Sequence, residues 1–244
     1  MYRGYFARNK RHGRGMVNFS NGWIFEGHFV GDSPEGLGEW KIDEHKIFKG
    51  YYKDGKRHGQ CFVDFQEFGK GDLIYVDDKI NGRGQYTDEI GTVYKGDFKN
   101  DQKSGSKCLE SYPNGEYYFG DFRIGKREGF GTLYAKNKVK KYEGSWVDGQ
   151  KCGNGIEVFS NGNLFYGRFM DDKKNGVGTV FNSEKRKIFK GFYKNGAKHG
   201  AGVLWDDSGY SILASEWLNG VEIGQRMPYD GPDLKNVGTK KLKL

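Results

Sequence analysis

Apolar and polar residues alternate along most of the chain in short runs that are separated by turn sequences. Tyr2, Gly4 and Phe6 occupy every second position, and the run 13–19 repeats this spacing. Because successive side chains of a strand point to opposite faces, each run places its apolar residues on one face of extended chain. Pairs such as Asn195-Gly196 supply the positive φ angles of tight hairpins. The pattern predicts consecutive β-hairpins.

The predicted hairpins recur every 23 or 24 residues. We count the first residue of each repeat as position 0; position 4 is then aromatic, and position 11 is glycine, in ten of ten repeats. The repeats start at Tyr2, Phe25, Phe48, Gly71, Tyr94, Tyr118, Tyr142, Phe165, Phe189 and Leu213. Two invariant columns predict an array of about ten hairpins over residues 1–226, followed by a basic C-terminal tail, 227–244.

The glycine columns predict how the core is built. An aromatic ring can lie flat over a neighbouring strand only where no side chain blocks it, and we assign the glycines to this role. Position 15 is apolar in eight of the nine full repeats, with Glu157 as the exception, and the opposite face carries charges such as Glu26 and Lys49. The expected fold is all-β: an elongated, twisted single-sheet solenoid of about ten stacked antiparallel β-hairpins.

Composition narrows the classes of protein. The chain is polar, with a mean hydropathy of −0.83, yet 16% of its residues are aromatic, and disordered chains are poor in aromatics. The net charge of +8 leaves acidic proteins, lipid headgroups and nucleic acid open as partners. No stretch approaches the ~20 apolar residues of a membrane span, and Met1 opens no apolar signal region. We expect an intracellular protein that is soluble unless tethered.

The residues that often carry chemistry show no catalytic pattern. Three cysteines, Cys61, Cys108 and Cys152, form no CxxC pair and are interpreted as structural thiols of a reducing compartment. The histidines of the Lys/Arg-His-Gly turns all fall at position 10, and paired carboxylates such as Asp77-Asp78 lie near turns. The Gly-x-Gly motifs precede neither a helix nor a Gly-Lys-Ser/Thr, as a phosphate loop would. The sequence predicts no enzyme, no metal site and no cofactor.

The segment from Tyr142 to Gly155 resembles the MORN repeat (membrane occupation and recognition nexus), whose pattern is near YEGEWxNGKxHGxG. Residues 48–59 and 189–200 match it as closely. Similar arrays occur in junctophilins, in radial-spoke heads of cilia and in cytoskeletal proteins of protists, and also beside the catalytic domains of lipid kinases and methyltransferases. The resemblance implies a non-enzymatic structural scaffold or adaptor that binds protein partners within a large assembly. The implied location is the cytoplasm or cytoskeleton, with the axoneme of a cilium or flagellum as the most specific site.

This chain departs from the family pattern in three repeats. The departures are Gly71, Leu73, Lys107, Leu213, Ser215 and Arg226. They make the fourth and tenth repeats irregular.

A first candidate surface is a column of basic residues at position 9, two residues before the invariant glycine. Seven of ten repeats carry it: Arg11, Arg57, Lys103, Arg127, Lys151, Lys174 and Lys198. Hairpins stacked ~10 Å apart would align these charges along one edge, at about one Debye length in 0.1 M salt. This basic ladder could attract acidic proteins or anionic phospholipids, which gives a membrane-associated tether as the alternative function. A solvated, solubilising turn explains the same column.

A second candidate surface consists of large rings that break the repeat norm: Trp23, Trp40, Tyr117 and Trp205. They suit the capture of a helix or an extended peptide on the aromatic face, and packing explains them equally well. Exposed end strands would offer a third contact, because unpaired strand edges attract further strands. Nucleic-acid binding is the weaker interpretation, since the packing columns already account for most aromatics.

Overall fold

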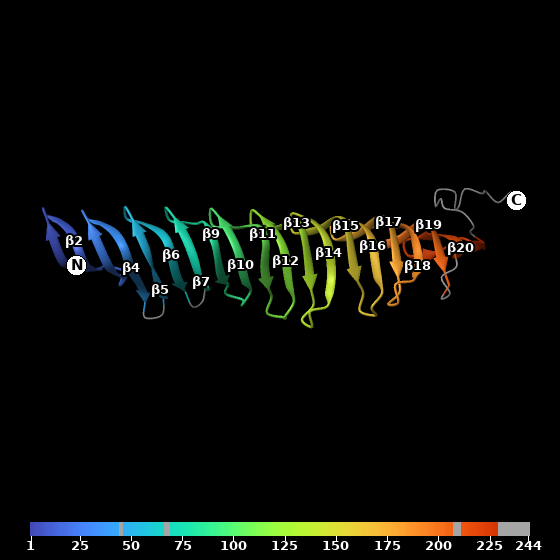
Figure 1. Cartoon of the computed structure of the whole chain (residues 1–244), viewed down its shortest axis with the longest axis horizontal. Helices are drawn as coiled ribbons and strands as arrows, with labels where there is room; N and C mark the ends of the chain where they lie inside the picture. The colour runs from blue at the N-terminus through green and yellow to red at the C-terminus, as the bar shows by residue number, and fades with distance from the viewer. Residues whose placement is uncertain (44–45, 66–68, 207–210, 229–244) are drawn as a thin grey trace. The chain divides into compact units, whose positions relative to one another are not determined.

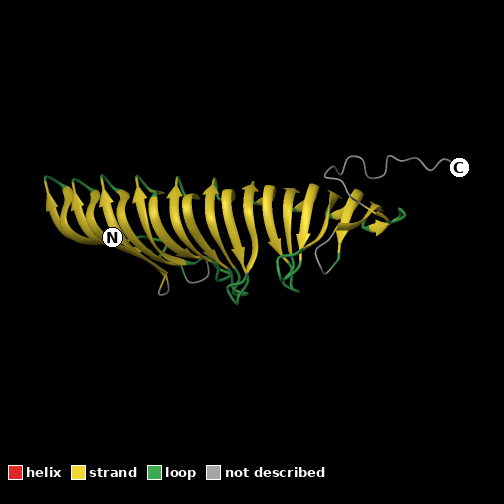
Figure 2. Cartoon of the chain, turned by 45° about the vertical axis from the view of Figure 1, so that its right-hand side comes forward, coloured by secondary structure: helices red, strands yellow, loops and turns green. Residues whose placement is uncertain are grey.

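The computed structural model describes residues 1–43, 46–65, 69–206 and 211–228. It divides into two compact parts, the N-terminal unit Met1–Lys126 and the C-terminal unit Arg127–Leu244. Within the described residues the regular structure is β-strand throughout, and the paired strands are antiparallel (Figure 2). The predicted all-β class and the antiparallel hairpin sheet are confirmed.

The N-terminal unit is an open sheet in which strands pair in chain order (Figure 1). Its strands are β1 (Tyr2–Ala7), β2 (Lys10–Asn18), β3 (Ile24–Val30), β4 (Ser33–Asp43), β5 (Lys46–Lys53), β6 (Lys56–Asp64), β7 (Lys70–Val76), β8 (Lys79–Ile80), β9 (Gly82–Thr87), β10 (Val93–Lys99), β11 (Gln102–Ser111) and β12 (Tyr117–Arg123). In the irregular fourth repeat, the short β8 and the following β9 share β7 as their partner.

The C-terminal unit follows the same plan. Its strands are β13 (Lys126–Tyr134), which begins at the unit boundary, β14 (Lys140–Val147), β15 (Gln150–Val158), β16 (Leu164–Met170), β17 (Lys173–Phe181), β18 (Lys187–Lys194), β19 (Ala197–Trp205), β20 (Ser211–Leu218), β21 (Val221–Glu222) and β22 (Met227–Pro228). Met227 and Pro228, the first residues of the predicted tail, pair with β20 and so extend the sheet. The rest of that tail, 229–244, lies outside the described residues.

The core of each hairpin is an aromatic ring that lies over two glycines. In the seventh repeat Gly144 and Gly155 face each other across β14 and β15. A Cβ added to Gly144 would lie 2.6 Å from Oη of Tyr142, and one added to Gly155 would lie 2.5 Å from the same atom. Phe165 occupies the same place over its own glycine pair. Packing of rings over glycine is therefore confirmed at Gly144 and Gly155, which are positions 2 and 13 of their repeat, and at the corresponding pair Gly167 and Gly178.

The rings also contact one another from hairpin to hairpin. Tyr142 packs edge-to-face on Trp146 of its own hairpin and on Phe169 of the next, with 5.1 Å between ring centroids in both pairs. This is a favoured geometry for aromatic pairs, and it recurs around Phe25 in the N-terminal unit. In the fourth repeat, which lacks the position 0 ring, Leu73 is 2% exposed and fills the space over the strand.

The glycine of position 11 has a different role from the one we inferred from the sequence. In the seventh repeat the register shifts between Gly144 and Trp146, so that Ser145 alone lies opposite residues 152–154. Gly153 sits in this bulge with a φ of +69°, in the left-handed region that favours glycine. The Tyr142 hydroxyl donates to the Ser145 carbonyl across the bulge, at 3.0 Å. Backbone conformation, rather than ring packing, requires glycine at position 11.

Candidate partner-binding surfaces

The hairpin turns at one edge of each unit are joined by a repeated backbone hydrogen bond. The N–H of position 7 donates to the carbonyl of position 9 in the preceding hairpin, as from Asp78 to Arg57 at 3.0 Å and from Gly149 to Arg127 at 2.9 Å. The other donors in this series are Asp32, Gly55, Asp101, Gly125, Asp172, Gly196 and Gly220. The carbonyls of the basic ladder are thus already used within the chain.

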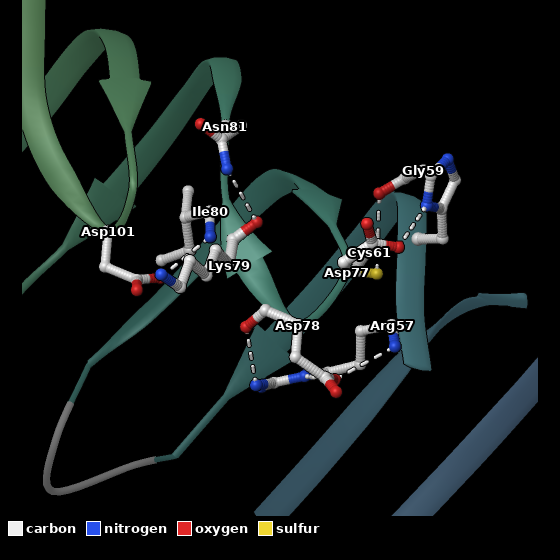
Figure 3. Close-up of polar contacts among 10 residues, drawn as sticks. Arg57, Gly59, Cys61, Asp77, Asp78, Lys79, Ile80, Asn81 and Asp101 are labelled. Carbon is white, nitrogen blue, oxygen red and sulfur yellow. Dashed lines mark hydrogen bonds and ion pairs between the residues drawn. The ribbon is translucent and has the colours of Figure 1, made fainter. Parts of the chain in front are cut away.

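In two hairpins an aspartate at position 7 also holds the side chain of the position 9 arginine from the preceding hairpin. Arg57 donates from its backbone N and from Nε to Oδ1 of Asp78, at 3.0 and 2.9 Å, and from Nη2 to the Asp78 carbonyl at 3.0 Å (Figure 3). Its guanidinium lies 4.5 Å from the ring centroid of Tyr75. Burial would raise the pKa of Asp78, but the hydrogen bonds from Arg57 outweigh it and lower that pKa. Arg11 and Asp32 repeat the arrangement.

Three lysines of the ladder form ion pairs with glutamates that lie outside the position 7 turn. Lys151 and Lys174 both donate to Glu157, each at 2.6 Å, and Lys103 donates to Glu110. This explains why Glu157 interrupts the apolar position 15: it lies between two ladder cations. Sequence reasoning missed this role, although the single polar residue in an apolar column was a usable signal.

All seven ladder residues have their charged groups over aromatic rings. The Lys198 ammonium lies 4.0 Å from the Phe189 centroid, and the Arg127 guanidinium 5.0 Å from that of Trp146. The other five contacts involve Arg11, Arg57, Lys103, Lys151 and Lys174. Burial lowers the pKa of Lys198. These cations cover the aromatic core, and such cation–π contacts contribute about 0.5–2 kcal/mol each.

Two of the four rings that we selected as partner contacts come together on the aromatic face of the N-terminal unit, where Trp40 also packs against Phe25. Trp40 lies 6.0 Å from Trp23 at an interplanar angle of 80°, and it stacks on Phe19 at 5.2 Å. Trp23 remains 39% exposed. Beside the two indoles is a pocket of about 260 Å³, lined by Trp23, Trp40, Phe48, Tyr52, Gly55, Arg57, Phe65 and Asp78.

The other two selected rings lie elsewhere. Tyr117 is the first residue of β12 and is half-buried, and it takes no part in the Trp23–Trp40 cluster. Trp205 ends β19 in the C-terminal unit, where the Lys187 ammonium lies 5.9 Å from its centroid.

The face opposite the aromatic core, called the outer face below, carries exposed apolar side chains that we did not predict. Leu37 and Tyr51 lie directly opposite each other on β4 and β5, and they are 52% and 53% exposed. In the C-terminal unit Phe130 and Tyr166 are similarly exposed. The outer face is therefore mixed rather than purely charged.

Comparison with known families decides what kind of array this is. The MORN repeat model matches eight segments, which together make up more than half of the chain: 2–24, 48–65, 74–93, 94–117, 118–138, 142–164, 165–180 and 189–210. The chain belongs to the MORN-repeat family. The second and tenth repeats that we read from the sequence fall largely outside the matched segments. A search of curated proteins finds no match.

MORN repeats are generally non-enzymatic structural repeats that bind proteins or membranes. Among the described residues no three His, Cys, Asp or Glu side chains are grouped so that they could hold a metal ion. The same part of the chain has no helix long and apolar enough to cross a membrane.

Proposed function

We propose that this MORN array is a non-enzymatic scaffold that binds protein partners within a large cytoskeletal or ciliary assembly. The ion pairs that the basic ladder already makes within the chain support protein rather than lipid as the ligand. At least five of its seven cations contact a carboxylate of the chain, at Asp32, Asp78, Glu110 and the shared Glu157. A cation already paired within the chain gains little from an anionic lipid headgroup, since it would first have to give up its internal partner.

The setting is tested by proximity labelling with the full-length chain in ciliated cells. We expect labelled proteins of the axoneme or of another cytoskeletal structure. The labelling enzyme expressed alone in the cytosol, without this chain, provides the background. Labelling no different from that background would contradict the scaffold proposal.

The net charge of +8 favours a second candidate, a membrane-associated tether that binds anionic phospholipids. Flotation with vesicles that contain or lack phosphatidylserine, at two salt concentrations, separates the two functions. For a protein scaffold we expect no salt-sensitive flotation. Flotation that is lost in a variant with Arg57, Arg127 and Lys151 changed to Glu would establish the tether, provided that Lys49→Glu with Lys95→Glu on the outer face leaves it intact. Circular dichroism of each variant checks that the sheet is retained.

A further inference from the structure

The edge of β1 that points away from β2 has no strand partner among the described residues. On the other edge Met1 exchanges two backbone hydrogen bonds with Asn18, at 2.6 and 2.8 Å. Because successive residues of a strand direct their backbone groups to opposite sides, the N–H and C=O groups of Tyr2, Gly4 and Phe6 point to the free edge. Such a row of unpaired donors and acceptors is a template for a further strand.

The aromatic packing is also incomplete at this edge. Phe6 occupies position 4 and is 63% exposed, whereas the position 4 rings of the other nine repeats are 1–7% exposed. In the second repeat the position 4 ring, Phe29, packs edge-to-face on Tyr2 of the preceding hairpin, at 5.5 Å, and the third repeat does the same. Phe6 packs on Tyr2 of its own hairpin and leaves its other side open. The edge therefore lacks a ring as well as a strand.

The bulge of β1 does not obstruct its free edge. The register of β1 shifts between Gly4 and Phe6 toward its hairpin partner β2. The register of β3 shifts likewise toward β4, yet β3 pairs with β2 of the preceding hairpin residue for residue, with Gly27 opposite Gly15. Glycine also faces glycine between other neighbouring hairpins, at Gly38–Gly50, Gly131–Gly144, Gly155–Gly167 and Gly178–Gly191. A matching strand brings a glycine opposite Gly4.

Strand β1 meets this requirement itself, because its sequence ring-x-Gly-x-ring is symmetric about Gly4. When two copies of β1 pair antiparallel about this glycine, Gly4 faces Gly4, and Tyr2 of each copy faces Phe6 of the other. The outward-pointing backbone groups of the two copies then meet as hydrogen-bonded pairs. Directly opposite residues lie on the same face, so the rings join on the aromatic face. On the outer face Arg3 lies opposite Tyr5, and no charge lies directly opposite a like charge.

We infer that two copies of this chain associate through β1, in a two-fold antiparallel pair centred on Gly4. Phe6 of each copy packs on Tyr2 of the other, which supplies the second aromatic contact that position 4 rings have elsewhere. The last long strand, β20, is protected differently: the short strands β21 and β22 cover parts of its edge, and β22 includes Pro228, a residue that blunts sheet edges. The inference goes beyond the proposed scaffold and does not depend on its partners.

Sedimentation of the full chain over a wide range of concentrations tests the association. We expect a concentration-dependent equilibrium between monomer and dimer. Phe6→Lys places a charge on the aromatic side of the edge and should weaken association about tenfold or more. Tyr166→Lys, which replaces an exposed ring on the outer face of the C-terminal unit, is the matched control and should associate like the wild type. Circular dichroism of both variants checks that the sheet is retained.

Cross-linking tests the register. Arg3 of one copy and Tyr5 of the other form a non-hydrogen-bonded pair, with Cα atoms about 4.5 Å apart, within reach of a disulfide. A mixture of the Arg3→Cys and Tyr5→Cys chains, oxidised with copper phenanthroline, should form covalent dimers. Each variant alone should form far fewer, because identical positions lie diagonally, about 7–8 Å apart. The wild type, in which Cys61 and Cys108 are buried and Cys152 is half-buried, gives the background.

Three results would each overturn the inference. They are a chain that stays monomeric, a dimer that Phe6→Lys leaves as strong as before, and cross-linking of the mixture no greater than that of the single variants. Partners recovered by proximity labelling would leave the scaffold proposal standing in each case.

Discussion

At the scale of single residues, two kinds of glycine have separate roles in the MORN hairpin. Gly144 is needed for space, since an added Cβ would lie 2.6 Å from Tyr142 Oη and from the Gly155 Cα. Gly149 is needed for conformation: its φ is +87°, and an added Cβ would meet nothing within 4 Å. The first role depends on the neighbouring hairpin strand, and the second only on the local turn.

We expect Gly144→Ala to destabilise the protein more than Gly149→Ala. Overpacking in a closed core costs about 1–3 kcal/mol, whereas a left-handed alanine costs about 1–2 kcal/mol. Urea unfolding followed by circular dichroism gives both losses in the free energy of unfolding. If Gly144→Ala proved the milder change, the ring would not be held against this glycine.

Glu157 makes part of the stability depend on pH. Burial would raise its pKa, but Lys151 and Lys174 outweigh that effect, and the pKa lies below the ordinary value of 4.5. A carboxylate with a lowered folded pKa stabilises the fold above its unfolded pKa and loses that contribution as pH falls through the folded value. We expect Glu157→Gln to lose about 2 kcal/mol at pH 7. The gap to the wild type should narrow below pH 4.5, measured by urea unfolding across this range. A constant gap would contradict the role of the charge.

At the scale of elements, the sequence determined the hairpins but not how their side chains cross to the next hairpin. Alternation and the turn pairs were enough to predict two strands per repeat, since both are local. The position of Arg57 over Tyr75 and against Asp78 depends on residues about twenty positions away. The repeat period brings these residues near one another without fixing where the long side chain points. For that reason the ladder was predicted as an exposed edge and its place over the core was missed.

The hydrogen bond from the Arg57 amide to the Asp78 carboxylate, which links neighbouring turns, can be tested by substitution of Asp78. Asp78→Ala removes the carboxylate that accepts from the Arg57 amide, so we expect that amide to exchange with solvent about tenfold faster, the effect of one hydrogen bond. Asp77→Ala is the matched control, since the Asp77 carboxylate is 65% exposed and lies 3.5 Å from Nδ1 of His58, whereas the Arg57 amide donates to Asp78. Hydrogen exchange followed by mass spectrometry measures both. Equal acceleration in the two variants would show that the Asp78 carboxylate does not hold the turn.

At the scale of the whole molecule, each hairpin packs on its sequence neighbours, so stability should be distributed locally. Phe169 is 3% exposed and contacts the rings of Tyr142 and Phe165. Phe169→Ala should cost about 3–5 kcal/mol and speed amide exchange in β14–β17, while β3–β6 in the N-terminal unit stay protected. Phe29→Ala in the N-terminal unit, where Phe29 is 1% exposed, should give the reverse pattern. Uniform loss of protection from either variant would instead mean that both units unfold as one cooperative body. The local outcome matters for a scaffold, because a partner bound on β4–β6 would then stabilise that region without ordering the rest.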